Sequence, residues 1–270
     1  MPKFYKGLTV KQVLEIKDIV PMSVSTVNKH LIRLSSLLKS GVVEGHLTCN
    51  YAEGVQIAQS RRVSEERKTY SLEDLKRIVI NLPREEDRPE RYWVPLIGMY
   101  AGMRLDEICQ LYVEDIQEVD GVWCFNVNGE QDKKVKTPSS NRIVPVHANL
   151  LKLGILGYRE KLKTLKCPRM WMNLKRRDSD GYGSAFGKWF QRFNREHVTT
   201  DKAKVFHSLR HTVTDTMKQA GIQEVVISEI MGHANDSMTM SRYGKRYQPR
   251  VLLEAMMLLD YGVTIPAWKV

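Results

Sequence analysis

Apolar residues recur at helical spacing along most of this chain, and strand-like alternation is confined to two short stretches. These are Val122–Val127 and Arg142–Val146, and the polar, lysine-rich residues 128–141 between them predict an exposed hairpin connection. Helical patterns cover residues 8–20, 23–39, 72–82, 91–101, a segment that begins at 104, and residues 183–196, 208–220, 223–231 and 250–259. The chain is therefore predicted to be mainly α with a small antiparallel β-sheet, an α+β fold.

A polar and highly charged stretch, residues 54–70, divides these helical patterns into two groups. The first group is small: its stronger stripe, Ser23–Lys39, is predicted to end before Gly41, and such a unit buries too little apolar surface to be stable alone. The second group begins at Ser71, a good N-cap, and its first helix stops before Pro83. We therefore expect a helical region with its linker over residues 1–66 and a larger domain over residues 67–270.

The charge of the chain points to a polyanionic partner. Its 42 Lys and Arg exceed its 31 Asp and Glu, which gives a net charge of +11. The segment Lys152–Arg210 alone holds 15 Lys and Arg against 5 Asp and Glu. Each phosphate that a cation neutralises releases condensed counterions, so this density favours nucleic-acid binding. A solvated basic face is the alternative.

The remaining composition narrows the class of protein. With 42% apolar residues the chain can build a sizeable core, which excludes a disordered or fibrous protein. Its longest apolar runs are about half of what a bilayer span needs, and no secretory pattern opens the sequence. The four cysteines lie 60, 15 and 43 residues apart, a spacing that fits neither a disulfide framework nor a zinc site. We expect free thiols, a cytoplasmic location and no membrane partner.

Three stretches carry residues suited to phosphate chemistry, and the first is Gly102–Ile108. Arg104 stands there at a loop-to-helix junction, where backbone N–H groups and the helix dipole favour an anion. Glu107, one turn on, is placed to hold the Arg104 guanidinium. An ordinary ion pair at a helix start is the alternative.

The other two stretches contain histidines. His207 and Arg210 are three residues apart, so on a helix they share a face and can converge on one anion. His211 would also suit a pair of metal ligands with His207, but a metalloprotease motif needs Glu where Ser208 stands. In the third stretch, His233 follows Gly232 and is itself followed, ten residues later, by Tyr243. A tyrosine near a helix end usually serves packing.

Taken in order, these residues resemble the tyrosine recombinase (phage integrase) family over roughly residues 71–245. The residues that match the family's catalytic positions are Arg104, Lys136, His207, Arg210, His233 and Tyr243. Lys136 precedes the strand Arg142–Pro145 as the family's hairpin lysine does, but the hairpin is one residue longer than usual. Lys133 and Lys134 are therefore rivals for that role.

The resemblance implies a reaction. In the family a tyrosine, here Tyr243, attacks a DNA phosphodiester and forms a covalent 3′-phosphotyrosyl intermediate. Arg104 and Arg210 would bind the non-bridging oxygens together with His233, His207 would take the tyrosine proton, and Lys136 would protonate the departing 5′ oxygen. The resemblance implies no metal and no cofactor. Its partners would be double-stranded recombination sites of a mobile element, a homo-tetramer in the synaptic complex, and accessory DNA-bending proteins.

Several points stay open at this level. The match to the family's core-binding domain is partial, since only Ser23–Gly45 and the residues after it correspond to the last portion of that domain. Tyr247 is four residues from Tyr243, and on a helix both would face the same way. The apolar segment Val251–Leu259 would dock either onto a neighbouring protomer or onto its own domain.

Three alternative functions compete with the recombinase. A type IB topoisomerase uses a similar residue set but relaxes DNA instead of exchanging strands. A non-catalytic DNA-binding protein would have lost at least one catalytic residue, and all are present here. A metal-dependent nuclease built on the histidines lacks nearby carboxylates at useful spacing.

Overall fold

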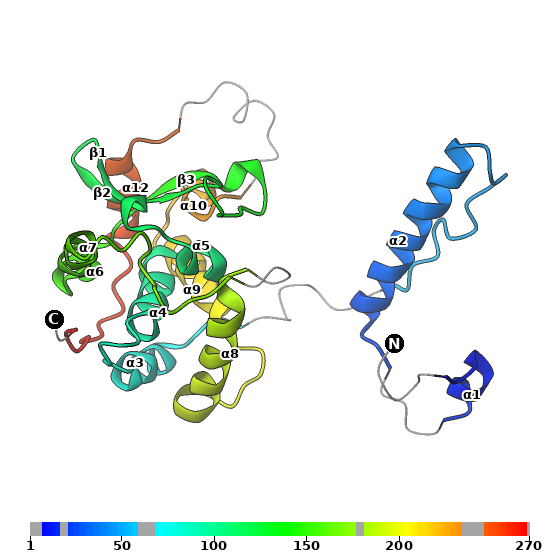
Figure 1. Ribbon diagram of the computed structural model, residues 1–270, viewed down its shortest axis with the longest axis horizontal. Helices are drawn as coiled ribbons and strands as arrows, with labels where there is room; N and C mark the ends of the chain where they lie inside the picture. Colours follow the sequence, from blue (N-terminus) through cyan, green and yellow to red (C-terminus); the bar gives the residue numbers. More distant parts are fainter. Residues whose placement is uncertain (1–6, 17–20, 59–67, 177–180, 234–245, 269–270) are drawn as a thin grey trace. The chain divides into compact units, whose positions relative to one another are not determined.

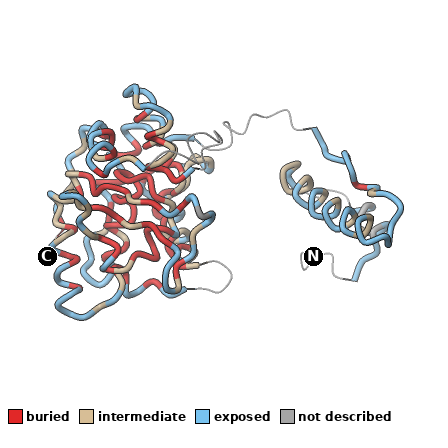
Figure 2. Tube along the Cα trace, turned by 90° about the horizontal axis from the view of Figure 1, so that it is seen from above, coloured by how far each residue is buried: buried red, intermediate tan, exposed pale blue. Residues whose placement is uncertain are grey.

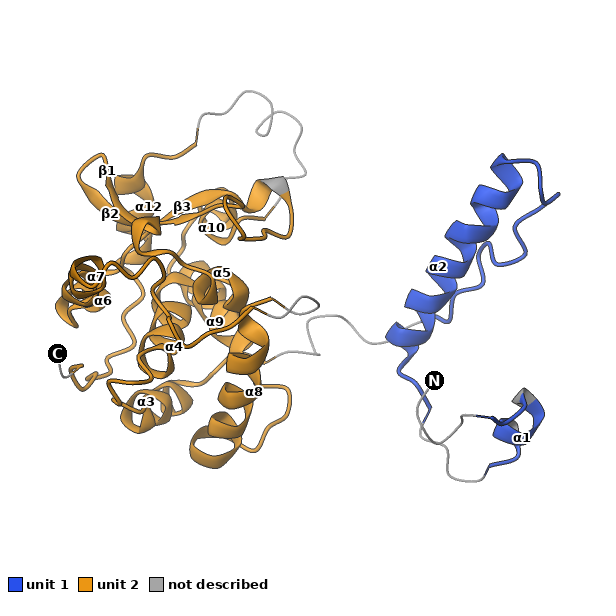
Figure 3. Ribbon diagram, in the orientation of Figure 1, with its two compact units in different colours: residues 1–65 blue, residues 66–270 orange. Residues whose placement is uncertain are grey.

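The computed structural model describes residues 7–16, 21–58, 68–176, 181–233 and 246–268. The chain divides into two compact units, Met1–Glu65 and Glu66–Val270 (Figure 3). This division lies next to the boundary expected at residue 66, and the assignment of the first unit to a core-binding region stays a prediction. Among the described residues, no helix combines the length and apolar character that crossing a membrane requires.

The first unit contains α1 (Val10–Leu14) and the long helix α2 (Val24–Val43), whose N-cap is Ser23. The prediction that the helix ends before Gly41 is wrong, because α2 continues to Val43. Gly41 is tolerated there because the Leu47 side chain folds back over it, and a Cβ would meet Leu47 Cδ1 at 3.0 Å. Along α2, all of which is described, no residue is buried.

The second unit is a helical domain around one core (Figures 1 and 2). Its helices are α3 (Leu72–Asn81), α4 (Glu90–Ala101), α5 (Leu105–Cys109), α6 (Ala148–Lys152), α7 (Ile155–Thr164), α8 (Gly183–Phe193), α9 (Phe206–Gln219), α10 (Glu224–Met231) and α12 (Pro249–Met256), and a π-helical turn (Asn194–Val198) extends α8. Eleven of the residues of α4 are buried, and this helix packs along α9. Gly98 permits the close approach, since a Cβ there would meet Phe206 Cζ at 2.9 Å.

A three-stranded antiparallel sheet packs against these helices in the order β1 (Ile116–Val119), β2 (Val122–Val127), β3 (Arg142–Pro145). The two predicted strands pair as expected, with Phe125 opposite Val144. β1 was not expected; it pairs with β2 across a tight turn in which Asp120 and Gly121 both have positive φ. The predicted fold class, mainly α with a small antiparallel sheet, is confirmed.

The C-terminal apolar segment packs onto its own domain. α12 lies against β2, β3 and α10, and Leu252, Met256 and Leu259 are buried (Figure 1). Further along, the Tyr261 hydroxyl donates to Met99 O at 3.2 Å. Of the two docking modes left open by the sequence, the structure places this segment within its own chain.

Candidate active site

Arg104 and Glu107 form the first part of the site, at the start of α5. Arg104 precedes the helix in an extended conformation, and its backbone N–H donates to Glu107 Oε2 at 2.9 Å. Its Nη1 donates to Glu107 Oε1 at 2.7 Å, so one carboxylate holds both the backbone and the guanidinium of Arg104. The ion pair expected at this junction is present, and 22% of the Arg104 side chain stays exposed to meet a ligand.

A second arginine, Arg142 at the start of β3, shares the same carboxylate. Its Nη1 donates to Glu107 Oε1 at 3.1 Å and its Nη2 to Glu107 Oε2 at 2.8 Å, a bidentate pair that is almost fully buried. The strand motif of Arg142 did not by itself predict this contact. One signal was present: Arg142 and Val144 lie two apart on a strand, hence on the same face, and that face is apolar. An arginine that faces a core needs a carboxylate partner.

The C-terminal turn of α10 gathers the guanidiniums of three arginines. Helix C-termini leave backbone carbonyls without partners inside the helix and carry a partial negative charge, so cations are stabilised there. Three successive carbonyls each accept a hydrogen bond from a different arginine: Ile230 O from Arg142 at 2.7 Å, Met231 O from Arg210, and Gly232 O from Arg104 at 3.4 Å. One helix end thus orients donors that come from three distant parts of the chain. We call Arg104, Arg142 and Arg210 the arginine cluster.

Two glycines in the left-handed region permit this approach. Gly232 (φ 63°) ends α10, and a Cβ there would meet Arg142 Nη1 at 2.9 Å. Gly102 (φ 60°) ends α4, and its carbonyl accepts a hydrogen bond from Arg210 Nη1 at 2.8 Å. A Cβ on Gly102 would meet the Met231 side chain at 2.6 Å. A larger residue at either position would be strained by its positive φ, and its Cβ would push against the Met231 or the Arg142 side chain.

The arginine cluster sets the protonation of the groups around it. Burial alone would raise the pKa of Glu107, but the hydrogen bonds and charge of Arg142, with those of Arg104, outweigh it and lower the pKa to about 2. Burial and the neighbouring charges of Arg104 and Arg142 lower the pKa of Arg210 to about 9. Arg210 still carries its charge at neutral pH. Three cations thus share one carboxylate, which leaves an excess of positive charge for an anionic ligand.

His233, one of the predicted site residues, lies directly beside this cluster. Its Nε2 lies 2.9 Å from Arg210 Nη2. Because a guanidinium can only donate, Nε2 must accept, and the ring proton of the neutral imidazole is therefore on Nδ1. Partial burial, together with the charges of Arg210 and Arg104, lowers the pKa of His233 to about 4, so the ring is neutral at pH 7.

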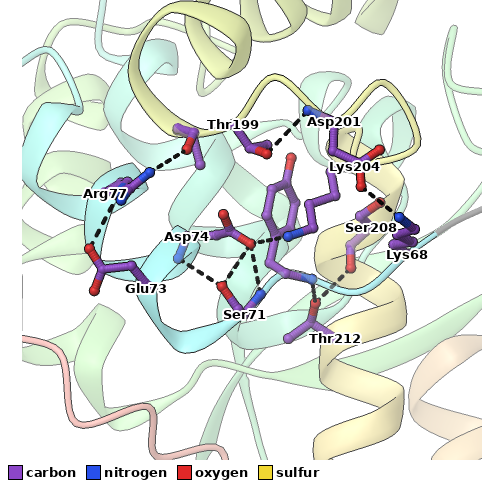
Figure 4. A network of polar contacts seen from close by, with 12 residues as sticks. Lys68, Ser71, Glu73, Asp74, Arg77, Thr199, Asp201, Lys204, Ser208 and Thr212 are labelled. Carbon is purple, nitrogen blue, oxygen red and sulfur yellow. Dashed lines mark hydrogen bonds and ion pairs between the residues drawn. The ribbon is translucent and has the colours of Figure 1, made fainter.

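His207 stands in the first turn of α9, one turn before Arg210. Its ring meets that of His211 edge to face, with centroids 4.9 Å apart. A polar network fixes this end of the helix (Figure 4). The Tyr70 N–H, in the segment that enters the second unit, donates to Thr212 Oγ1 at 2.9 Å, and Lys204, just ahead of the helix, pairs with Asp74 of α3.

The three candidate lysines have different surroundings. Lys133 is buried, and its Nζ lies 2.5 Å from Asp115 Oδ1. Lys134 and Lys136 are exposed in the segment between β2 and β3. A proton donor for a bound ligand must be accessible, so the burial of Lys133 disfavours it as the catalytic lysine. Nothing in the described contacts joins Lys136 to the arginine cluster.

The two tyrosines also differ in what the structure describes. Tyr243, the predicted nucleophile, lies outside the described residues. Tyr247 is described: it is half-buried against the core, and its backbone N–H donates to Glu229 Oε1 at 3.0 Å. The structure therefore brings Arg104, Arg210 and His233 together and places His207 one turn from Arg210, while the catalytic roles of all six residues, and the placement of Lys136 and Tyr243 at the site, stay predictions.

The described cations of the basic segment Lys152–Arg210 fall into two groups. Among the cations that the structure describes here, five contact groups within the protein: Arg159, Arg169, Arg195, Lys204 and Arg210. Nine others are exposed: Lys152, Lys161, Lys163, Lys166, Lys175, Arg176, Lys188, Arg192 and Lys202. Part of the charge that suggested a polyanionic partner is thus used by the fold itself.

Comparison with known proteins places these features in a family context. Residues 70–249 match the model of the Phage integrase family. Tyrosine recombinase XerA of Pyrococcus furiosus is 27% identical over 173 residues, which cover 64% of this chain and 55% of that protein. Tyrosine recombinase XerC of Thermodesulfovibrio yellowstonii is 24% identical over 241 residues, which cover 88% of this chain and 75% of that protein. The chain thus spans about half the length of the first relative and three quarters of the second.

Solved structures share the fold. The Tn1549 transposon integrase in complex with transposon right end DNA aligns with a TM-score of 0.56 and 18% identity, over 87% of this chain and 79% of that one. A lambda integrase tetramer bound to a Holliday junction aligns with a TM-score of 0.56 and 17% identity, over 80% of this chain and 60% of that one. At these identities the likeness is one of fold.

Proposed function

This chain belongs to the phage integrase family, and on that premise we propose that it is a site-specific DNA recombinase that cleaves and rejoins strands through a 3′-phosphotyrosyl intermediate. The observation that carries the proposal is the arginine cluster on the C-terminal turn of α10. A phosphodiester under attack gains negative charge on its non-bridging oxygens, and planar guanidiniums fixed in advance are the donors best suited to bind it.

The proposed cleavage conserves the number of phosphoester bonds. The Tyr243 oxygen attacks phosphorus, a tyrosine–phosphorus bond forms, and the bond from phosphorus to the 5′ oxygen breaks. The phenol proton passes to His207 and the departing 5′ oxygen takes a proton from Lys136. Rejoining is the reverse reaction with the 5′ hydroxyl of another strand. Because no bond energy is lost, the reaction requires neither a nucleotide cofactor nor a metal.

The arginines would share the work unequally. Arg104 is partly exposed and Arg210 is anchored by two backbone carbonyls, so these two are suited to bind the phosphate oxygens. Arg142 spends four hydrogen bonds on Glu107, Ile230 and Ser140, which suits it to hold the cluster in place. His233, neutral at pH 7 with its proton on Nδ1, would donate a further hydrogen bond to the phosphate from that nitrogen while its Nε2 accepts from Arg210.

The partners we propose are double-stranded recombination sites and further copies of this chain. The structural relatives include integrases bound to DNA and a tetramer on a Holliday junction, which supports a homo-tetramer in the synaptic complex. Accessory DNA-bending proteins and a cytoplasmic location complete the proposal. The assignment of residues 1–66 to a core-binding region belongs to it as well.

The test begins by selecting bound duplexes from a randomised pool, because the target sequence is unknown. A nicked duplex that carries the selected sequence should then trap a covalent protein–DNA complex that survives denaturant and is unaffected by EDTA. Loss of trapping with EDTA would indicate metal chemistry. Absence of any trapping by a folded protein that binds the duplex would leave a non-catalytic DNA-binding protein. Relaxation of a supercoiled plasmid without exchange between two sites would indicate a topoisomerase.

A further inference from the structure

A second polar cluster lies at the base of the segment that carries Lys136. The Arg169 guanidinium is sandwiched between the rings of Tyr112 and Tyr182, with its central carbon 4.2 Å from each centroid. It pairs with Asp132, which also accepts hydrogen bonds from the Tyr112 hydroxyl at 2.8 Å and the Tyr182 hydroxyl at 2.5 Å. These contacts, with that of Tyr182 the strongest, lower the pKa of Asp132 to about 2. We call these four residues the Arg169 clamp.

The two residues after Asp132 are held as well. Lys133 pairs with the buried Asp115. Gln110 accepts from the Lys134 backbone N–H at 3.0 Å and donates to the Lys134 carbonyl at 3.0 Å, as a neighbouring strand would. Three consecutive residues of the loop are thus attached to the domain, and the next residue, Val135, packs against the core.

These attachments limit where Lys136 can be. It follows Val135 directly and Lys134 by two residues, so its Cα lies within about 7 Å of the Lys134 Cα. At the other side, Ser140 is buried and its carbonyl accepts from Arg142 Nη1 at 3.0 Å, which ties that side to the arginine cluster. Lys136 is therefore tethered between the clamp and the cluster.

The Arg169 clamp also reaches α5, the helix that Arg104 precedes. Tyr182 precedes Gly183, whose backbone N–H donates to Asp106 Oδ1 at 2.7 Å in the first turn of α5. Arg169 Nη1 donates to Gln110 O at 3.2 Å, at the other end of α5. The base of the 128–141 loop and helix α5 thus contact the same few residues.

We propose that Arg169 is a positioning residue that fixes the base of the 128–141 loop so that Lys136 reaches the departing 5′ oxygen. The proposal rests on the proposed function and assigns Arg169, which lies within the basic segment, to the lysine instead of to DNA. A planar guanidinium is required because it stacks on two rings while its edge pairs with a carboxylate, and a lysine ammonium cannot do both.

The experiment compares two nicked duplexes of the selected sequence: one with the natural 5′ oxygen at the scissile bond, and one with sulfur in its place. A thiolate departs without a proton, so the sulfur duplex does not need the lysine. The variants are Arg169→Met, Asp132→Asn and, as the reference, Lys136→Ala. Arg91→Met is the matched control, since Arg91 also lies over an aromatic ring, Trp189, and pairs with a carboxylate, Glu85, away from the loop.

We expect Arg169→Met to cleave the oxygen duplex about 10- to 100-fold more slowly than the unmodified protein, and the sulfur duplex within about threefold of it. Asp132→Asn should change the two rates in the same pattern by a smaller factor, and Arg91→Met should change neither. Because Arg169 acts through Lys136, the variant that combines Arg169→Met with Lys136→Ala should cleave the oxygen duplex no more slowly than Lys136→Ala alone.

The outcomes distinguish a failure of this inference from a failure of the proposed recombinase reaction. Equal slowing on both duplexes, or loss of DNA binding in folded Arg169→Met and Asp132→Asn, would make Arg169 a structural or DNA-binding residue and overturn the inference. Unchanged cleavage of the oxygen duplex by Arg169→Met would also overturn the inference. If sulfur rescues Lys136→Ala but not Arg169→Met, the inference fails alone. If sulfur does not rescue Lys136→Ala, the assignment of the acid fails, and this inference with it.

Discussion

The arginine cluster and the Lys136 segment are both cationic, yet the protein holds them in opposite ways. Arg142 and Arg210 are 3% and 4% exposed, and backbone carbonyls at a helix end fix their guanidiniums. Lys136 is exposed and is held only through its neighbours in the chain, since Lys134 bonds to Gln110 and Ser140 bonds to Arg142. The difference follows from the two proposed tasks. Charge stabilisation is strongest when donors are fixed in a dry site, whereas a proton donor has to reach a departing atom.

The largest effect is expected at the proposed nucleophile, Tyr243, on which both regions would act. Tyr243→Phe should bind the selected duplex normally yet form no covalent complex on the nicked duplex, because a phenyl ring has no oxygen to attack phosphorus. Tyr247→Phe, its matched control, should still form the complex, since Tyr247 serves packing. Gel separation under denaturing conditions measures both. Trapping by Tyr243→Phe but not by Tyr247→Phe would move the nucleophile to Tyr247.

The fixed side of the contrast predicts the next largest effect. Arg210→Ala should raise the barrier to cleavage by about 3 kcal/mol or more, as expected for a lost oxyanion donor, with DNA affinity little changed. Arg210→Lys should restore little, because one ammonium cannot bond Gly102 O, Met231 O and a phosphate in that geometry. Single-turnover cleavage and equilibrium binding give the two numbers. A loss of binding as large as the loss of cleavage would contradict a role in the transition state.

Glu107 tests how much the cluster stabilises the fold. Its pKa of about 2 lies below the ordinary value of 4.5, so its contribution is fully present above pH 4.5 and is lost as the pH falls toward 2. At pH 7, Glu107→Gln should lower the free energy of unfolding by roughly 3 kcal/mol, and the difference from the unmodified protein should shrink below pH 4.

Urea unfolding at pH 7 and pH 3 measures this effect. Glu73→Gln is the control, because Glu73 pairs with Arg77 on the exposed face of α3 and should cost no more than about 0.5 kcal/mol at either pH. An equal loss of stability for Glu107→Gln at both pH values would show that packing, and not charge, makes up the contribution of Glu107.

The two lysines of the same loop sharpen the contrast further. Lys136→Ala should leave the melting temperature unchanged and slow cleavage of the oxygen duplex about 100-fold. Lys133→Ala leaves the buried Asp115 without its cation, so it should lower the free energy of unfolding by about 3 kcal/mol. It should also slow cleavage of the oxygen and the sulfur duplex by the same factor. Calorimetry and the paired cleavage assay distinguish them. Rescue by sulfur in Lys134→Ala instead of Lys136→Ala would move the acid to Lys134.

The smallest effect is expected in the basic segment. Lys188 is exposed and lines the same pocket as Leu105 and Asp106, which follow Arg104 in the sequence. Lys188→Met should therefore reduce, by about 0.9, the slope of the logarithm of DNA affinity against the logarithm of salt concentration. Lys204 is held by Asp74, and Lys204→Met should leave the slope unchanged while it lowers stability. Binding measured over a series of salt concentrations tests both. Equal slopes for the two variants would mean that exposure does not identify the phosphate contacts.

Local patterns predicted most of the elements correctly, and the errors have particular causes. The strand Val122–Val127 was placed to the residue because its β-formers stand between turn signals. β1 was missed because Ile116–Val119 has only four residues, two of them polar, and forms only by pairing with β2. The end of α2 was misplaced because Gly41 stops a helix in isolation, while here Leu47 packs over it.

The sequence by itself determined most of the helices, the two-stranded core of the sheet, and the set of residue types that suits phosphate chemistry, because these depend on spacing within a few residues. Only the tertiary structure decided that Arg142 joins Arg104 at Glu107, that α10 ends where three guanidiniums meet, and that Lys133 is tied to Asp115. The partners in those contacts lie 35, 88 and 18 residues apart for Arg142–Glu107, Arg142–Ile230 and Lys133–Asp115. The spacing of residues within one helix or strand cannot predict contacts between residues so far apart in the sequence. Packing of the core brings these residues together.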